Sequence, residues 1–499
     1  MRFLTAAAVL LATTATTPLI APQAAAAAAV QPCTPESCYE AGALRKDLLR
    51  LHRKLPTMVH NLYAQAEEEE FEEAYAEARR AILTDMPKAK AHLLFQRYLT
   101  TAQMAHLKTD ALIADAITHF QEGGRVLPFN IRVVDDGLLV TPFLIGSDTL
   151  PNGSIITSIN GEATYDVLDR MGALIAADTE DMVYAIAEQG FPFYYYLLEG
   201  EVSQLQLDII RPDGTKASID YYVGGTIRDM EELGAGVTEE DPDAVDFSTR
   251  EVSFPGNGIA YLRPGPFGNI EGEPRPEGVA YDPTAFEAFL TDAFDRIAAE
   301  GSTDLLIDLR DNPGGDNSFS DLLVARIADK PFRWASRFEV RASAENKARV
   351  NATSPEPGSL SAQMKDLELA TADGAIYSVE LPEVAPRADN RFDGRVWVLV
   401  DRHSYSNAVV TAATLQDHGF ATVLGEETRD VATTFGSAEQ FTLPETGIVV
   451  TYPKSFIVRP SGLESDSYIE PDEEFFDLAL GREEADMLER AIAEIEASR

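Results

Sequence analysis

The chain has few cysteines, few basic residues and no long apolar run beyond its first segment. Only 2 cysteines occur in 499 residues, Cys33 and Cys38. No histidine lies near them in the sequence, so we assign no metal site, although in an oxidising compartment they could close a short disulfide loop. Lys and Arg number 41 against 82 Asp and Glu, which gives a formal net charge of −41. This charge argues against nucleic acid and anionic membrane surfaces as partners.

The longest apolar segment lies at the start of the chain. Residues 1–29 carry Arg2, an apolar stretch through Leu11 and then several Ala-x-Ala sites, a pattern typical of a cleaved secretory signal. Thr and Pro interrupt the run, which falls short of the roughly 20 apolar residues of a membrane span. We therefore expect a periplasmic or secreted protein with no membrane span.

The rest of the chain divides into four regions by pattern. Residues 30–125 have helical periodicity, residues 126–226 alternate short strands with turns, and residues 227–250 form an acidic linker. In residues 251–499 apolar strands alternate with amphipathic helices, which predicts a largely parallel sheet with helices on its faces. The expected fold is a multidomain α/β protein with a helical N-terminal region and a β-rich middle domain.

Individual elements of the last region can be predicted as well. Strands are expected at Leu305–Leu309 and Val396–Val400, and helices at Pro283–Glu300 and Asn407–His418. The polar stretch Ala342–Ala370 is expected to be a loop.

Two polar turns follow the two predicted strands. They read Asp-Leu-Arg-Asp-Asn-Pro-Gly-Gly from Asp308 and Asp-Arg-His-Ser-Tyr-Ser-Asn-Ala from Asp401. Active sites of parallel sheets lie beyond the carboxyl ends of their strands, and a helix N-terminus offers unpaired N–H groups to a developing oxyanion. The pattern therefore predicts a serine hydrolase with Ser406 as the nucleophile.

The backbone N–H groups of Gly314, Gly315 and Asn407 are the candidate oxyanion hole. Structural readings compete with these roles, because a serine can simply cap a helix and glycines can simply form a turn. Asp308 and Arg310 are expected to hold the turn by a salt bridge.

Several motifs together resemble the C-terminal processing (tail-specific) serine peptidases and their tricorn-like and retinoid-binding-protein-like branches. The resemblance rests on Asp308-Leu309-Arg310-x-Asn312-x-Gly314-Gly315, Asp401-Arg402-x-Ser404-x-Ser406, Leu415-Gln416-Asp417-His418-Gly419, Gly425-Glu426-Glu427-Thr428 and Tyr468-Ile469-Glu470-Pro471-Asp472. It implies a catalytic domain of the crotonase/Clp-protease-like type, a PDZ-like domain over residues 126–226, a polypeptide substrate and no cofactor. It also places the nucleophile on Ser406 rather than Ser404.

The chain departs from that family at the lysine that serves as general base. One alignment puts Val431 at the position of the lysine and the other puts Ser437 there. Because a serine hydroxyl is a weak nucleophile without a base, the usual Ser-Lys dyad is excluded unless another residue substitutes. The resemblance to the tricorn-like branch, with its Ser-His-Glu system, implies His106 as the base and Glu464 as the residue that orients it.

Other bases stay open. His119 is one alternative, and Lys454 is another if burial lowers its pKa. His403 is expected to shape the turn and His418 to be structural.

The leading hypothesis is a secreted or periplasmic serine endopeptidase that cleaves unfolded or C-terminally exposed polypeptides. One alternative is a catalytically inactive peptide- or ligand-binding protein on the same scaffold, because fold does not determine function. Another is a hydrolase of non-peptide esters or amides. The middle domain either adds an extended peptide to a sheet edge or serves as a spacer.

Overall fold

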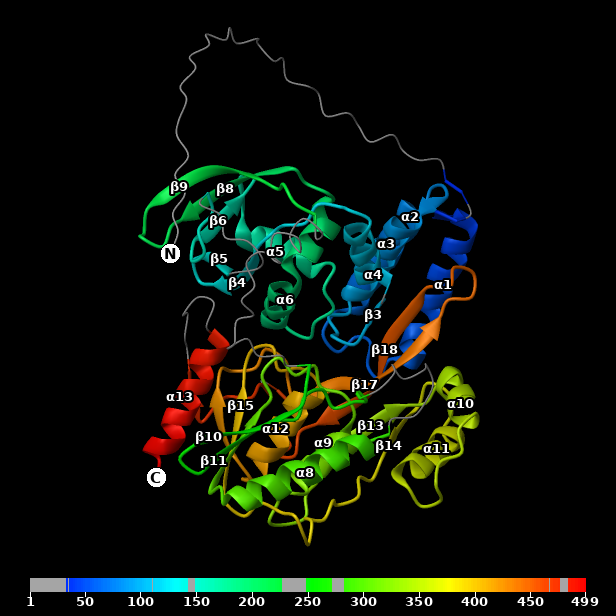
Figure 1. The fold of residues 1–499 in the computed structure, drawn as a ribbon. Coiled ribbons are helices and arrows are strands. Elements are labelled where there is room, and N and C mark those ends of the chain that lie inside the picture. Colours follow the sequence, from blue (N-terminus) through cyan, green and yellow to red (C-terminus); the bar gives the residue numbers. More distant parts are fainter. Residues whose placement is uncertain are drawn as a thin grey trace, which may run out of the picture.

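The computed structural model describes residues 33–34, 36–109, 111–141, 149–226, 248–271, 282–465, 467–475 and 483–499. The expected signal segment and most of the expected linker, 227–250, lie outside these residues. Figure 1 shows blue helices beside a cyan and green strand-rich unit, with a larger α/β body coloured green to red. None of the helices in the described part combines the length and the apolar character that crossing a membrane requires.

The described residues up to Gln121 form a group of helices and three very short strands. The helices are α1 (Ala41–Met58), α2 (Glu68–Ala81), α3 (Lys88–Thr100) and α4 (Ala111–Gln121), and the strands are β1 (Cys38–Tyr39), β2 (Met86–Pro87) and β3 (Lys108–Thr109). In α1 the buried leucines Leu44, Leu48, Leu51 and Leu55 recur at helical spacing and face one core. Cys33 and Cys38 form a disulfide just before α1.

The next unit is an antiparallel sheet with two helices, and its strands follow the order β4-β5-β6-β8-β9, with β7 paired to β6. Its elements are β4 (Asn130–Val134), β5 (Gly137–Thr141), β6 (Ile155–Ile159), β7 (Glu162–Ala163), α5 (Thr164–Gly172), α6 (Glu180–Glu199), β8 (Gln204–Ile210) and β9 (Lys216–Tyr222). The strands alternate buried and exposed residues, as in β8, because one face of the sheet packs on a core. We call residues 126–226 the strand-rich unit.

The α/β body contains a six-stranded sheet, which we call the large sheet, with the order β10-β11-β12-β15-β16-β19. Its strands are β10 (Glu251–Gly256), β11 (Ile259–Arg263), β12 (Asp304–Asp308), β15 (Arg395–Val400), β16 (Thr422–Gly425) and β19 (Glu473–Glu474). Only β10 runs antiparallel to its neighbour. The strands predicted at 305–309 and 396–400 are thus β12 and β15.

Helices cover both faces of this sheet, so its inner strands are apolar throughout. On one face Leu305 and Ile307 share a core with α8 (Thr284–Glu300), α9 (Asn317–Val324) and α12 (Asn407–Asp417). On the other face Leu306 packs in the core that includes α13 (Glu483–Ala497).

A second sheet in this body joins it to the N-terminal helices. It consists of β14 (Ile376–Ser378), β13 (Arg337–Arg341), β18 (Val449–Val458) and β17 (Thr434–Thr442) in that order. β3 pairs antiparallel with β18, so that Thr109 faces Val450. Figure 1 shows β3 lying between the blue helices and β18. This pairing carries the residues just before β3 to the mouth of the large sheet.

The prediction of a loop at Ala342–Ala370 is wrong, because the segment folds into α10 (Ala344–Asn351) and α11 (Leu360–Ala370). Ser343 and Ser359 cap these helices by accepting from Asn346 N and Ala362 N. The buried Glu368 accepts from Ser343 N at 2.9 Å. The sequence of α10 is mostly polar, whereas in α11 Leu360, Met364 and Leu367 recur at helical spacing and pack on a core, a signal that the loop prediction overlooked.

Candidate active site

The expected nucleophile lies in the turn between β15 and α12, residues 401–406, which we call the nucleophile turn. Ser406 has φ 54° and ψ −121°, a backbone conformation that costs a non-glycine residue about 1–3 kcal/mol. Such a sharp strand-to-helix turn presents a hydroxyl at the edge of a sheet. Ser404, by contrast, is buried and donates its hydroxyl to Leu309 O at 2.8 Å. The hydroxyl of Ser404 therefore holds two turns together, and that of Ser406 is left for chemistry.

His106 lies beside this hydroxyl although 300 residues separate the two in sequence. Its Nε2 is 3.5 Å from Ser406 Oγ. The imidazole also stacks on the ring of Tyr405, with ring centroids 5.6 Å apart and planes 23° apart. Two structural elements thus position the base: the β3–β18 pairing and the ring of the residue next to the nucleophile.

His106 is held in its neutral form. Burial, reinforced by the nearby charge of Lys108, lowers its pKa to about 4, and the backbone of Phe435 offsets only part of this effect. A neutral imidazole at neutral pH can accept the proton of a serine hydroxyl. Within the described part of the chain, no carboxylate accepts a hydrogen bond from the buried Nδ1 of His106.

The structure does not bring Glu464 to that nitrogen. The Glu464 side chain is 56% exposed and pairs with Arg337 at 3.1 Å. The expectation that it orients His106 is therefore not met in this structure. Its position in the loop after β18 could not be fixed by its sequence distance from Pro471, because loop length does not determine loop path.

The alternative bases are engaged elsewhere. Lys454 is buried and pairs with Glu439. Burial lowers its pKa, and the charge of Glu439 opposes the change. His119 lies 3.2 Å from Glu201, and His418 bonds to Arg333 O at 2.9 Å. Of these candidates, only His106 contacts the Ser406 hydroxyl in the described residues.

The candidate oxyanion donors meet at the start of α12. Gly314 has φ 81°, and a Cβ there would lie 2.5 Å from Asn407 N, so only glycine allows the two turns to approach. The N–H of Gly314 itself donates to Asn312 Oδ1 at 2.9 Å. The N–H groups of Gly315 and Asn407 donate to no other described group. The arrangement favours Gly315 and Asn407 as donors, with Gly314 providing the close approach.

The first of these turns is fixed by the predicted salt bridge. Arg310 donates to both carboxylate oxygens of Asp308, at 2.9 and 2.7 Å, and both side chains are buried. Such a bidentate pair holds the glycines in place behind the nucleophile.

Sequence reasoning missed two buried carboxyl groups beside Ser406 and His106. Asp430 accepts from the backbone N–H of Ser406 and from that of Val431 at 2.7 Å. Asp178, from the strand-rich unit, accepts from Ala105 N at 2.9 Å and from Thr434 Oγ1 at 2.9 Å. One carboxyl group thus holds the residue that carries the nucleophile, and the other holds the neighbour of the base.

These two carboxyl groups titrate close to neutral pH. Burial and the charge of Asp178 raise the pKa of Asp430 to about 7, against the hydrogen bonds from Ser406 and Val431. Burial also raises the pKa of Asp178 to about 6. Asp430 precedes Val431, the position where the family lysine was sought, so inspection of that position could have drawn attention to it. No signal in the sequence points to Asp178.

A second polar cluster lies on the other side of the nucleophile turn. Glu188 of α6 bonds to Arg402 at 2.7 Å and to His403 at 2.9 Å. Glu426 accepts from Arg402 at 2.9 Å and from Arg132 of β4 at 2.9 Å. We call these five residues the charged cluster. It joins the strand-rich unit to the nucleophile turn, a role that agrees with the shaping role expected for His403.

Within the charged cluster, opposite charges fix the protonation states. Burial would raise the pKa of Glu188, but the His403 bond and Arg402 lower it. Burial would likewise lower the pKa of His403, but Glu188, followed by Asp311 and Asp401, raises it to about 9. His403 is therefore an imidazolium at neutral pH and cannot act as a base.

One group of side chains in the described residues has the spacing of metal ligands: Asp311, Asp401 and His403, whose ligand atoms lie within 4.8 Å of one another. A protonated imidazole cannot bind a metal ion, and His403 is held protonated by Glu188. Burial and the charge of Asp311 raise the pKa of Asp401 to about 7, and the charges of His403 and Arg310 offset only part of this effect. The group fits an internal ion pair better than a metal centre, and we assign no metal to it.

Comparison with known proteins decides the family. Residues 261–475 match the model of peptidase family S41. This region belongs to peptidase family S41. The chain is accordingly a serine-type peptidase, and its resemblance to the tail-specific peptidases is confirmed. No curated protein sequence matches the chain.

Solved structures extend the likeness of fold beyond residues 261–475 to most of the chain. Mature CPAF is 14% identical, with a TM-score of 0.61 over 87% of this chain and 92% of that one. Mature CPAF complexed with lactacystin is 13% identical, with a TM-score of 0.63 over 91% of this chain and 97% of that one. At these identities the comparison establishes a shared fold.

Proposed function

We propose that this chain is an exported serine endopeptidase in which Ser406 is the nucleophile and His106 is the general base. The observation that carries the proposal is the 3.5 Å contact between Ser406 Oγ and a neutral imidazole. It is supported by a strained serine at the N-terminus of α12 and by the N–H groups beside it. The disulfide between Cys33 and Cys38 suits an oxidising compartment such as the periplasm.

The reaction would proceed in two steps, acylation of Ser406 and hydrolysis of the acyl-enzyme. Ser406 Oγ attacks the carbonyl carbon of the substrate while its proton passes to His106 Nε2, and the N–H groups of Gly315 and Asn407 stabilise the oxyanion. When the C–N bond breaks, protonated His106 donates that proton to the leaving amine. Water attacks the acyl-enzyme, gives one proton to His106, and the Ser406 oxygen recovers it on release of the acid.

The substrate proposed is an unfolded polypeptide or an exposed C-terminus. The strand-rich unit resembles a PDZ-like domain, a fold that adds an extended peptide to a sheet edge. Its helix α6 contacts the nucleophile turn through Glu188. Such a contact would place a captured chain near Ser406.

A fluorophosphonate probe tests the nucleophile. Labelling and casein hydrolysis are expected with the unmodified protein and are expected to be lost in Ser406→Ala, while the exposed Ser461→Ala serves as the matched control. Lactacystin, with which one CPAF structure is complexed, should compete with the probe. Absence of labelling in a folded protein would overturn the proposal and favour an inactive binding protein. Labelling with ester turnover but no peptide cleavage would favour an esterase.

A further inference from the structure

A cavity of about 410 Å³ opens beside the nucleophile turn. Pro313, Tyr405 and Asp430 line one of its sides, and each is next to a group that surrounds Ser406. Its size falls in the usual range for small-ligand pockets, about 300–1,000 Å³. A substrate bound at Ser406 would therefore reach it with a side chain close to the scissile bond.

Most of the cavity wall is apolar and comes from two other regions of the chain. The strand-rich unit supplies Leu174, Met182 and Ile186, and α4 supplies Leu112. Apolar walls of this kind favour a large aliphatic or aromatic side chain, because its burial gains about 25 cal/mol per Å².

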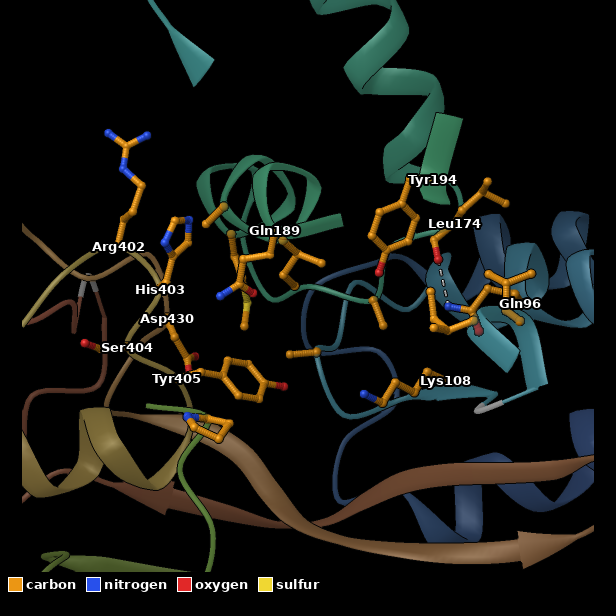
Figure 2. Close-up of a pocket in the computed structure, with 18 of the residues that line it drawn as sticks. Gln96, Lys108, Leu174, Gln189, Tyr194, Arg402, His403, Ser404, Tyr405 and Asp430 are labelled. Atoms are coloured by element: carbon orange, nitrogen blue, oxygen red, sulfur yellow. Dashed lines mark hydrogen bonds between the residues drawn. The ribbon is translucent and has the colours of Figure 1, made fainter. Parts of the chain in front are cut away.

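Three polar groups point into this apolar space. Figure 2 shows the ammonium of Lys108 and the hydroxyl groups of Tyr194 and Tyr405 directed toward the middle of the cavity. All three can donate a hydrogen bond to an anion. Gln189 also lines the cavity, but its amide donates to Asp311 at 3.1 Å.

Lys108 is exceptional in a chain with 82 acidic residues. It is exposed, and within the described ranges no carboxylate forms an ion pair with it. The β3–β18 pairing that positions His106 also positions Lys108, since Lys108 faces Thr451. An unpaired cation fixed at the edge of an apolar pocket recognises a carboxylate.

We propose that this cavity is the specificity pocket of the peptidase and takes a large apolar substrate side chain with a neighbouring carboxylate held by Lys108, Tyr194 and Tyr405. The carboxylate is either the C-terminus of the substrate or an acidic side chain. This inference rests on the proposed function and names its substrate class.

Binding to the Ser406→Ala protein tests the pocket without any turnover. The probes are fluorescein-labelled peptides that contain Phe, ending either in a free carboxylate or in an amide. A second pair carries Glu or Gln after the Phe and ends in an amide. Fluorescence anisotropy should show one or both carboxylate peptides binding about tenfold more tightly than their neutral partners, as for a charge-assisted hydrogen bond. The pair that shows the preference identifies the source of the carboxylate.

Variants separate the cation from the apolar wall. In the Ser406→Ala background, Lys108→Met should abolish the carboxylate preference, whereas Lys90→Met, an exposed lysine on α3, should retain it. Ala185→Trp should fill the cavity and remove the preference for Phe over Ala, with circular dichroism to confirm folding. Equal binding of acid and neutral peptides, or a preference that survives Lys108→Met, would overturn the proposal.

Failure of the pocket and failure of the proposed function give different results. Probe labelling at Ser406 without carboxylate preference would refute only the pocket. Carboxylate preference without probe labelling would refute the peptidase and leave the pocket as the site of a binding protein.

Discussion

The two sides of the nucleophile turn differ in how their buried charges are compensated. On one side the charged cluster pairs Glu188 and Glu426 with Arg402, Arg132 and protonated His403. On the other side His106 is neutral, and Asp178 and Asp430 have raised pKa values. Paired charges hold fixed protonation states, whereas burial keeps His106 neutral and moves the titration of Asp178 and Asp430 close to neutral pH. The comparison indicates that the first side is structural and the second is reactive.

The largest expected effect is on activity, when the histidine on each side is replaced separately by glutamine. His106→Gln should lower kcat/KM for peptide hydrolysis by about 10³-fold or more, because it removes the general base. His403→Gln should lower it far less, because an imidazolium paired with Glu188 accepts no proton. Initial rates with a quenched fluorescent peptide measure both. Equal losses of kcat/KM in the two folded variants would contradict the assignment of one side as structural and the other as reactive.

The second effect is on stability. Glu188→Ala leaves Arg402 and His403 without their shared buried partner, and we expect the free energy of unfolding to fall by about 3–5 kcal/mol. Urea unfolding followed by tryptophan fluorescence measures it. Glu180→Ala, an exposed glutamate on the same helix, is the matched control and should change little. A small loss in Glu188→Ala would show that the charged cluster does not hold the two regions together.

The third effect is the pH dependence of stability. Asp430 titrates at about 7 in the folded protein against 3.8 normally, so between these values the folded state binds more protons than the unfolded state. Stability should therefore decrease as pH rises through this window, by up to about 1.4 kcal/mol per pH unit for this group. His106 acts with the opposite sign, because its pKa falls from 6.5 to about 4 and stability rises with pH between them.

Asp430→Asn isolates the contribution of this carboxyl group. Urea unfolding across the window should show a smaller decrease in stability toward neutral pH in the variant than in the unmodified protein, because Asp178, whose pKa is also raised, still contributes. Identical pH profiles for the two proteins would mean that Asp430 is ionised throughout the window.

The smallest effect is expected at Glu464. Glu464→Gln removes an exposed pair with Arg337, and such pairs contribute about 0–1 kcal/mol. Peptidase activity and thermal stability should both stay close to those of the unmodified protein. A loss of activity approaching that of His106→Gln would show that Glu464 reaches the base when substrate is bound.

Local patterns predicted the large sheet well. Each of the strands β12 and β15 is an apolar run that ends at a polar turn, so a short window of sequence contains the whole signal. The prediction missed α10, which is mostly polar, and α11, although Leu360, Met364 and Leu367 recur there at helical spacing. The helix beginning at Asn407 was predicted because an apolar run follows the turn.

The candidate site was predictable only in part. Ser406 and the glycine turn lie in motifs that can be read directly, and Asp308 with Arg310 forms the salt bridge expected between neighbours in sequence. Glu464 was placed by its distance from a motif along a loop, and that distance does not determine a position in space. Asp178 and Lys108 carry no local signal, because their roles depend on which other segment they face.

By itself the sequence determined the nucleophile turn, the glycines behind it and the absence of a lysine from the family position, because each depends on residues a few positions apart. Only the tertiary structure decided which ionisable side chain lies beside Ser406 where the family lysine is missing. His106 and Ser406 are 300 residues apart and meet because β3 pairs with β18. The same packing removes water from the imidazole and from two carboxyl groups, and this desolvation sets their protonation states.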